Sequence, residues 1–384
     1  MRTNSRAMGT VGTLCVMGFM LLIVGCSGGG QKPGAGGKST AAAKKGCATC
    51  EKKDTCAAGM LKPELLFKLD ETQSSPDGMC IGKDGCIYLS MNNKNNNFKS
   101  PCKIMRITKD DKLEDFFELP GHPETKITSP LGIGFGSDGH LYVSDNQMFV
   151  KDDLGKSRLL RIVIEDGKAV KCECVATGLN MANGLASKGD CIYVNDTTFG
   201  LKDKPMTSGV YCFKISELKA DAPVKVTGPK DPHMILEIKT ENADPNYQVG
   251  ANGLDFDGKG NMYVCDFGDA EVMKVTFKAD GSVDTCKSLV KGGGMKCVDG
   301  CHTDGEGNLW IADFMGNAIA KVCCESGKVM IVAKNEPGDG KDGALDAPSE
   351  CIRRDDKVYV SNIDITHGPN KGDSLHTMSV IKLK

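Results

Sequence analysis

Short apolar runs alternate with Gly-rich polar turns along most of the chain, a pattern typical of β-hairpins. The clearest example lies within Lys296–Asn317, where a half-apolar run leads through the turn Asp304–Gly307 to the β-prone run Asn308–Ala312. β-branched and aromatic residues favour strands, whereas glycine and aspartate favour the turns between them. This segment therefore predicts a hairpin, with the carboxylate of Asp299 near the start of its first strand.

The same hairpin pattern occurs six times. In each copy an anchor residue stands ten or eleven positions before an aromatic residue, and the position after the anchor is glycine in five of the six copies. The copies are Pro76-Asp77-Gly78 with Tyr88, Pro130-Leu131-Gly132 with Tyr142, Ala182-Asn183-Gly184 with Tyr193, Ala251-Asn252-Gly253 with Tyr263, Val298-Asp299-Gly300 with Trp310, and Pro348-Ser349-Glu350 with Tyr359. Successive anchors are 54, 52, 69, 47 and 50 residues apart. A near-constant period of this size indicates a repeat architecture.

A second hairpin follows the first in most copies, for example Leu159–Ile164 with a turn at Glu165–Lys168. Four short strands in about 50 residues make up one blade of a β-propeller. We therefore predict an all-β fold, a six-bladed β-propeller of four-stranded blades. A pair of β-sandwiches is the main rival fold, but it does not require six similar hairpins at a near-constant period.

An open ring would leave an exposed edge strand that invites aggregation. The runs Glu64–Leu69 and Thr377–Lys384 both have strand character. We expect these N- and C-terminal strands to close the ring by completing the blade that begins at Ser349. The longest spacing precedes Asn252, and we interpret the prolines and weak periodicity of Leu201–Gly250 as an insertion that forms a lid or rim loop.

The first residues have the features of an export signal. Arg2 and Arg6 precede the apolar run Val11–Val24, which is too short for a comfortable membrane span. The end of this run resembles the bacterial lipobox, and that resemblance implies cleavage before Cys26 and lipidation of this cysteine. The alternative is an ordinary signal peptide, or an N-terminal membrane anchor, with a chance cysteine.

These features divide the chain into a lipoprotein signal peptide at 1–25, a flexible tether at 26–62 and the propeller at 63–384. We expect an exported protein that its lipid anchors to a bacterial membrane, on the periplasmic or cell-surface side. Lysine and arginine together number 48 against 50 aspartate and glutamate residues, for a net charge of −2. Because there is no basic excess, nucleic acid is not expected as a partner.

Nineteen cysteines are many for an exported protein. Cys47, Cys50 and Cys56 in the tether lack a fourth ligand, which leaves a metal or redox role, a local disulfide and plain surface thiols as alternatives. The cysteines of the propeller mostly fall within expected strands, where they have the character of small apolar core residues. A disulfide framework is the alternative that an oxidising compartment would favour.

Four of the six anchors carry an oxygen ligand: Asp77, Asn183, Asn252 and Asp299. In a propeller all anchors would lie at the same end of the innermost strands and face one central channel. Two carboxylates and two amide oxygens form a hard, oxygen-only site that favours Ca²⁺ or a similar divalent ion over copper or thiolate-bound zinc. Asn-Gly and Asp-Gly pairs are also common turn formers, but four of one class at equivalent repeat positions favour a shared metal site.

These motifs resemble the SMP-30/gluconolactonase/LRE-like superfamily of six-bladed propeller hydrolases. The resemblance covers about Pro63 to the C-terminus. It is carried by Pro76-Asp77-Gly78-Met79-Cys80, Asn183-Gly184-Leu185, Asn252-Gly253-Leu254-Asp255, and Val298-Asp299-Gly300 followed by Gly307-Asn308-Leu309-Trp310-Ile311-Ala312. In that family a Glu of the first blade, Asn residues of the third and fourth, and an Asp of the fifth bind a catalytic divalent ion. Blade order gives those places to Asp77, Asn183, Asn252 and Asp299.

The resemblance implies a metal-dependent hydrolase of lactone- or ester-type small molecules. The ion would polarise the substrate carbonyl, while Asp299 would act as general base or nucleophile. Two positions depart from the family pattern. Asp77 replaces the longer Glu, and Met181 stands where gluconolactonases often have a sugar-binding arginine.

His302 follows Asp299 by three positions and suits calcium poorly as a ligand. We expect it to support the ligands from behind or to be a satisfied core histidine. Cys297 and Cys301 flank Asp299, but no fourth ligand completes a zinc site with them. The alternative function is a non-catalytic, NHL-like propeller that binds a peptide, glycan or protein partner. In either case we expect a monomer.

Overall fold

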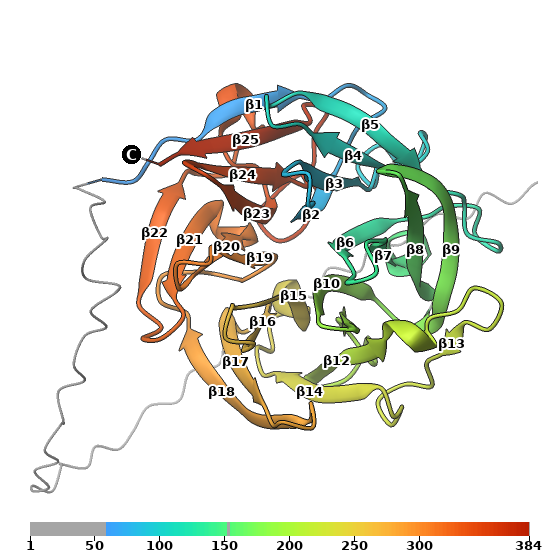
Figure 1. The fold of residues 1–384 in the computed structure, drawn as a ribbon. Coiled ribbons are helices and arrows are strands. Elements are labelled where there is room, and N and C mark those ends of the chain that lie inside the picture. The colour runs from blue at the N-terminus through green and yellow to red at the C-terminus, as the bar shows by residue number, and fades with distance from the viewer. Residues whose placement is uncertain (1–58, 152–153, 384) are drawn as a thin grey trace, which may run out of the picture. The chain divides into compact units, whose positions relative to one another are not determined.

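The alternation of apolar runs and polar turns forms strands, as predicted. The computed structural model describes residues 59–151 and 154–383, and the strands of this part build six sheets. Figure 1 shows the sheets arranged as the blades of a ring, each with its first strand nearest the axis. The predicted all-β, six-bladed propeller is therefore confirmed.

We number the blades in chain order from the first anchor. Blade 1 consists of β2 (Pro76–Ile81), β3 (Ile87–Met91), β4 (Lys103–Ile107) and β5 (Leu113–Glu118). Blade 2 consists of β6 (Pro130–Phe135), β7 (Leu141–Asp145), β8 (Ser157–Glu165) and β9 (Lys168–Leu179). Blade 3 consists of β10 (Ala182–Lys188), β11 (Cys191–Asp196), β12 (Met206–Lys214) and β14 (Met234–Thr240). Blade 4 consists of β15 (Ala251–Phe256), β16 (Met262–Asp266), β17 (Glu271–Phe277) and β18 (Val283–Lys291). Blade 5 consists of β19 (Cys301–Thr303), β20 (Asn308–Asp313), β21 (Ala318–Cys323) and β22 (Val329–Lys334). Blade 6 consists of β23 (Pro348–Arg354), β24 (Lys357–Asn362), β25 (Thr377–Lys382) and β1 (Glu64–Lys68). Short 3-10 helices are η1 (Gln147–Phe149), η2 (Ile215–Glu217), η3 (Pro245–Tyr247), η4 (Phe314–Gly316) and η5 (Lys341–Gly343). None of the helices in residues 59–151 and 154–383 has the length and apolarity to span a membrane.

The two ends of the described chain share blade 6. Strand β1 forms its outer edge and pairs antiparallel with β25, with Glu64 opposite Val380 and Lys68 opposite Thr377. The expected closure of the ring by N- and C-terminal strands is confirmed. Cys26, Cys47, Cys50 and Cys56 lie outside the described residues, so the lipid anchor and the tether cluster stay predictions.

The interpretation of Leu201–Gly250 as an inserted loop is wrong. This segment contains β12 and β14, the two outer strands of blade 3. Glycine, serine and threonine in β12, together with prolines in the flanking connections, weakened the apolar alternation there. The real extra length is the connection between these strands, which adds β13 (Val224–Lys225) to blade 2 as a parallel edge strand beside β9.

The hydrophobic core lies between neighbouring blades. Tyr88 and Ile104 of blade 1, for example, belong to one cluster with Ile133 and Val143 of blade 2. Because the apolar side chains pack between the sheet faces, the centre of the ring is left to polar groups.

Glycine after the anchor is required by the close approach of the inner strands. A Cβ on Gly78, Gly132, Gly184 or Gly253 would lie less than 3 Å from the anchor carbonyl oxygen of the next blade. No real side chain tolerates that distance, so these four glycines mark the contact between inner strands rather than turns, whereas a Cβ on the fifth, Gly300, would meet the Glu350 side chain.

In blades 1, 2, 4 and 5 the repeated aromatic residue is fixed by a carboxylate in the turn before it. The Tyr142 hydroxyl donates to Asp138 Oδ2 at 2.9 Å, and the indole Nε1 of Trp310 donates to Asp304 Oδ2 at 3.1 Å. Each of these aromatic side chains therefore ties the second strand of its hairpin to the turn.

All fourteen described cysteines are free thiols. The expectation of core positions holds for Cys80, Cys265, Cys301 and Cys351, which are buried, whereas others such as Cys191 are half-buried. Within the described residues most cysteines therefore pack as small side chains, Cys286 is exposed, and none forms a disulfide.

Candidate metal centre

The four predicted ligands converge on one pocket. Asp77 lies in β2, Asn183 in β10 and Asn252 in β15, and Asp299 stands two residues before β19. All four line a cavity of about 210 Å³, which lies at the end of the ring where the inner strands begin. Residues that are far apart in the sequence thus face one space, because equivalent positions of each blade point at the same channel.

In blades 2, 3, 5 and 6 a recurring acidic or amide side chain fixes the segment before the anchor. Asp313 at the end of β20 accepts hydrogen bonds from the backbone N–H groups of Lys296 (3.0 Å) and Cys297 (3.0 Å), just before Asp299. Asp196 at the end of β11 accepts from Met181 N–H at 2.7 Å in the same way. Sequence reasoning missed this role, although the signal was present: Asp or Asn stands three positions after five of the six aromatic residues.

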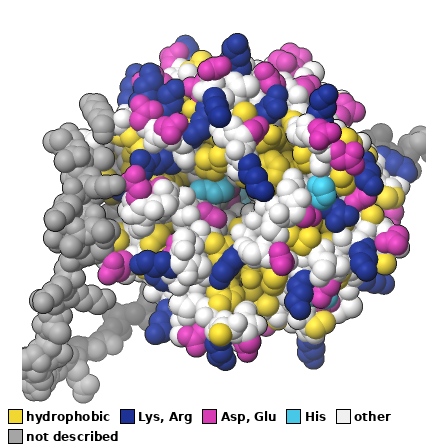
Figure 2. Space-filling view, in the orientation of Figure 1, with side chains coloured by type: hydrophobic (Ala, Val, Ile, Leu, Met, Phe, Trp, Pro, Cys, Tyr) yellow, Lys and Arg dark blue, Asp and Glu magenta, His cyan; other side chains and the backbone are white. Residues whose placement is uncertain are grey.

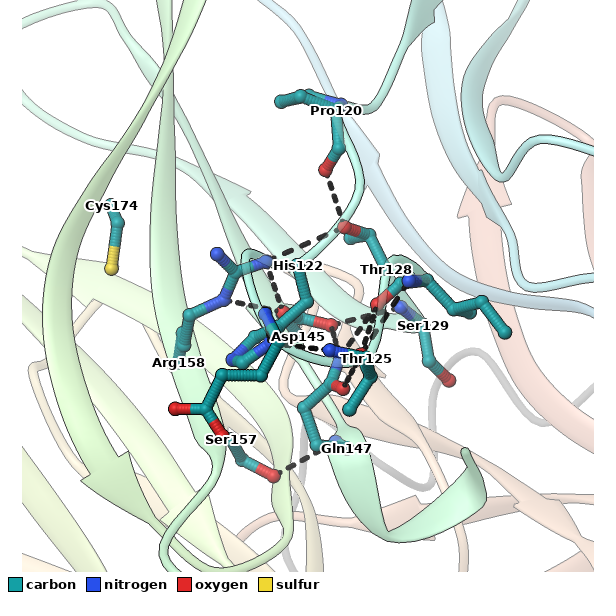
Figure 3. Close-up of polar contacts among 12 residues, drawn as sticks. Pro120, His122, Thr125, Thr128, Ser129, Asp145, Gln147, Ser157, Arg158 and Cys174 are labelled. Carbon is teal, nitrogen blue, oxygen red and sulfur yellow. Dashed lines mark hydrogen bonds and ion pairs between the residues drawn. The ribbon is translucent and has the colours of Figure 1, made fainter. Parts of the chain in front are cut away.

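In blade 2 this residue is Asp145, and it forms a buried ion pair (Figure 3). Arg158 Nε donates to Asp145 Oδ2 at 2.7 Å, while Asp145 Oδ1 accepts from Ser129 N–H at 2.8 Å and from Gln147 Nε2 at 2.7 Å. The pair joins the two ends of the connection between β7 and β8. That connection carries Phe149, which lines the pocket.

The carboxylates of the pocket are in a strongly unfavourable setting for negative charge. Burial raises the pKa of Asp299 well above its ordinary value, and the nearby carboxylates of Asp77 and Glu350 raise it further, against a hydrogen bond from Asn252. Burial also raises the pKa of Asp77 to about 6, although the Ser349 side chain opposes this shift. Two acidic groups that repel each other in a buried pocket need a proton or a cation to balance them.

The donor set fits a divalent cation. Asp77, Asn183 and Asn252 are 8%, 8% and 6% exposed, so their oxygen atoms face the pocket and not bulk water. Two carboxylates and two amides offer oxygen atoms only, which is the preference of calcium, and their charge would balance a 2+ ion. Leu131 and Ser349 fill the remaining two anchor positions and add no charge.

Apart from His367, the walls of the pocket are apolar. They consist of Leu131, Phe149, Met181, Val249, Phe267, Phe314, Ile363 and Ile365. Met181 occupies the wall beside Asn183, so the departure noted in the sequence places a thioether where an arginine would offer hydrogen bonds. A polar floor with apolar walls suits an apolar ligand with one polar group.

Comparisons with known proteins bear on the fold. No family model and no curated protein matches the chain. Among solved structures, a luciferin-regenerating enzyme is similar, with a TM-score of 0.53 and 16% identity over 84% of this chain and 97% of that chain. A gluconolactonase from Xanthomonas campestris has a TM-score of 0.50 and 15% identity over 85% of this chain and 96% of that chain. A PQQ-bound aldose sugar dehydrogenase from Streptomyces coelicolor has a TM-score of 0.50 and 15% identity over 83% of this chain and 98% of that chain.

The chain has the fold of the gluconolactonase-like six-bladed propellers. The expected resemblance is thereby confirmed at the level of the fold. Since a sugar dehydrogenase shares this fold with a gluconolactonase, the fold does not select a reaction, and function must be argued from the site.

Glu350 is a buried carboxylate beside the candidate site that sequence reasoning missed in this gluconolactonase-like fold. It stands where the other blades have glycine, and its carboxylate occupies the space that a Cβ on Gly300 would need. Burial raises the pKa of Glu350 to about 7, against the influence of His302. The sequence did hold a signal for Glu350, because it is the one residue after an anchor that is not glycine.

His302 lies between two carboxylates. Its Nε2 is 3.6 Å from Glu350 Oε1, and its Nδ1 is 3.7 Å from Asp255 Oδ2. Burial alone would lower the pKa of His302, but Glu350 and Asp255 outweigh it and raise the pKa to about 9. His302 does not line the pocket. Its positive charge offsets the negative charges of Glu350 and Asp255.

The flanking cysteines are packing residues. Cys297 is fully buried and its Sγ accepts a hydrogen bond from Met315 N–H at 3.1 Å, while Cys301 is 1% exposed. Among the residues that the structure describes, no cluster of cysteine and histidine has the geometry of a metal site.

His367 also lines the pocket and had no signal in the repeat. It belongs to the connection between β24 and β25, where its ring packs against Phe267 and Phe314 and its Nε2 lies 2.8 Å from the carbonyl oxygen of Asn246. Burial lowers the pKa of His367. At neutral pH this side chain therefore adds a neutral polar group to the pocket wall.

A larger cavity, of about 330 Å³, lies at the other end of the strands between the turns of blades 4 and 5. Several of its polar groups are already paired: Asp257 Oδ2 accepts from Tyr263 and Asn261, and Lys274 donates to the Cys324 carbonyl at 3.0 Å. We therefore place the candidate site at the anchors. Figure 2 shows one face of the ring, which is hollowed at its centre and has lysine, arginine and acidic side chains interspersed over its surface.

Proposed function

We propose that this protein is a metal-dependent hydrolase of lactones or related esters. The cation would be held by Asp77, Asn183, Asn252 and Asp299, with Ca²⁺ favoured by the oxygen-only donor set. The observation that carries the proposal is the convergence of these four side chains, from four blades, on one pocket whose walls are apolar apart from His367.

A bound divalent cation would polarise the carbonyl of the substrate and stabilise the negative charge that develops on its oxygen. The side chains of the chain have separate tasks. Asn183 and Asn252 contribute amide oxygens without adding charge, and Asp77 contributes a carboxylate from the opposite side of the ring. Asp299 faces the pocket, and its carboxylate, held ionised beside the cation, would accept a proton from water.

The apolar walls favour a lactone or ester with an aliphatic or aromatic substituent over a sugar lactone. A gluconolactone presents several hydroxyl groups, and His367 is the one polar side chain that the described residues add to the wall. Desolvating the remaining hydroxyl groups against Phe267, Phe314 and Met181 costs free energy. We infer that an alkyl-substituted lactone or an aryl ester has the higher kcat/KM.

The test is a hydrolysis screen with Ca²⁺ or with EDTA, using alkyl lactones, aryl esters and gluconolactone. Activity should require the ion, and Asp299→Ala should lower kcat by about 100-fold or more, the usual loss for a general base. Asp284→Ala, which removes an exposed carboxylate from the outer strand β18, is the matched control and should retain activity.

Absence of hydrolysis, together with absence of any bound divalent ion, would favour the alternative, a non-catalytic propeller with a peptide, glycan or protein ligand. If gluconolactone proved to be the best substrate, the inference from the apolar walls would be wrong while the hydrolase proposal survived.

A further inference from the structure

Three carboxylates meet in blade 6, outside the pocket. Asp346 precedes β23, and Asp364 and Asp373 belong to the connection between β24 and β25; one oxygen atom of each lies within 4.8 Å of the others. Asp346 and Asp364 are only 2% and 1% exposed, whereas Asp373 is exposed. Two buried acidic groups are thus open to solvent through the third.

Positive charge near this cluster is scarce. Within the described residues no lysine or arginine forms an ion pair with Asp346, Asp364 or Asp373. The one ion-pair partner is His376, whose Nδ1 lies 3.1 Å from Asp364 Oδ2. At least two negative charges therefore lack a counterion if all three groups are ionised.

The hydrogen bonds leave one oxygen atom of the cluster unsatisfied. Asp364 Oδ2 accepts from Asn95 Nδ2 at 2.7 Å, and its Oδ1 accepts from Asp373 N–H at 3.1 Å. Asp373 Oδ1 accepts from Leu375 N–H at 2.6 Å. Asp346 Oδ2, by contrast, is buried and has no hydrogen-bond partner. A buried carboxylate oxygen without a partner carries a large desolvation cost.

We propose that Asp346, Asp364 and Asp373 bind a divalent cation, with Ca²⁺ favoured by their carboxylate chemistry. Such an ion would satisfy Asp346 Oδ2 and balance the charge of the cluster. It would also tie the segment before β23 to the connection between β24 and β25. That connection carries Ile363, Ile365 and His367 into the wall of the pocket, so the ion would order the pocket without taking part in chemistry.

A shared proton is the competing occupant. Burial raises the pKa of Asp346 to about 8, and the carboxylates of Asp364 and Asp373 contribute to the shift. In the absence of a cation, protonated Asp346 could donate a hydrogen bond to Asp364. The two occupants differ in a measurable way, because only a cation site responds to added Ca²⁺.

The test uses Ca²⁺ alone as the probe and the full chain with Asp299→Ala as the background, so that the pocket ion does not contribute. Equilibrium dialysis should find one Ca²⁺ per chain, and Ca²⁺ should raise the melting temperature relative to EDTA. Adding Asp346→Asn, which keeps the shape and removes the charge, should abolish both effects.

The matched control is Asp342→Asn, an exposed residue of the preceding segment whose left-handed backbone Asn also tolerates. This variant should bind Ca²⁺ as the background does. If Asp346→Asn fails to fold, the exposed Asp373→Asn serves instead and should weaken Ca²⁺ binding at least about 10-fold.

The proposal is overturned if the background binds no Ca²⁺, or if it still binds one ion with unchanged affinity after Asp346→Asn or Asp373→Asn. A melting temperature that responds to pH but not to Ca²⁺ would establish the shared proton instead. None of these outcomes bears on hydrolysis at the pocket, which the activity screen tests separately.

Discussion

At the scale of single residues, glycine decides how closely the inner strands approach. Gly253 has ordinary backbone angles, yet a Cβ there would lie less than 3 Å from Asp299 O and Cys301 N. Since Asp299 is a proposed ligand, the same contact that closes the ring also sets the position of the site.

Gly253→Ala is therefore expected to destabilise the protein by about 1–3 kcal/mol, the usual cost of overpacking. Gly258→Ala is the matched control, because a Cβ at Gly258 would meet nothing within 4 Å. Urea unfolding of both variants is the measurement. Equal unfolding midpoints for the two variants would show that the inner strands can move apart.

The sequence indicated the anchors but not all of the channel. Asp77, Asn183, Asn252 and Asp299 were found because each occupies the same place in a repeat. Glu350 occupies the neighbouring place, but there the pattern expects glycine, and only the structure shows that its carboxylate lies against Gly300 of the next inner strand. His367 lies in a connection of one blade alone, so no repeat could reveal it.

At the scale of elements, strands were predictable where apolar alternation was strong. Strand β12 was missed because glycine, serine and threonine interrupt that alternation, and its place in blade 3 is set by pairing with β11. The closing strand β1 was predictable, because a ring without it would expose an edge.

Closure by β1 rests on a half-buried apolar face. Phe67 packs against the core cluster of blades 1 and 6, whereas Leu65 on the opposite face is 45% exposed. Phe67→Ala should cost about 2 kcal/mol, less than the loss for a fully buried phenylalanine, and Leu65→Ala should cost under about 0.5 kcal/mol. Thermal unfolding distinguishes them, and a larger loss for Leu65→Ala would contradict the pairing of β1 with β25.

At the scale of the whole molecule, the ring gathers buried acidic groups. Burial raises the pKa of Asp77 to about 6 and those of Asp196, Asp266 and Glu350 to about 7. Between the ordinary values near 4 and these raised values, the folded protein binds more protons than the unfolded chain. The stability that these protons provide is present in full below about pH 4 and is lost as pH rises through about pH 7.

In EDTA, the urea midpoint is therefore expected to fall as pH rises from about 5 to about 7.5. The pKa of His302 is raised too, to about 9. Its contribution to stability therefore also falls with rising pH, but at a higher pH than that of the carboxyl groups. Carboxylates with a lowered pKa, such as Asp304, titrate below this window. A midpoint that rises across the window would contradict this account of the buried carboxyl groups.

The central claim is that four equivalent positions of the ring form one divalent-cation site. Equilibrium dialysis of Ca²⁺ against wild type, Asp299→Ala and the exposed control Asp284→Ala tests it most directly. The account predicts that Asp299→Ala binds one ion fewer per chain than wild type, while Asp284→Ala binds the same number as wild type. Equal binding by wild type and Asp299→Ala would contradict it.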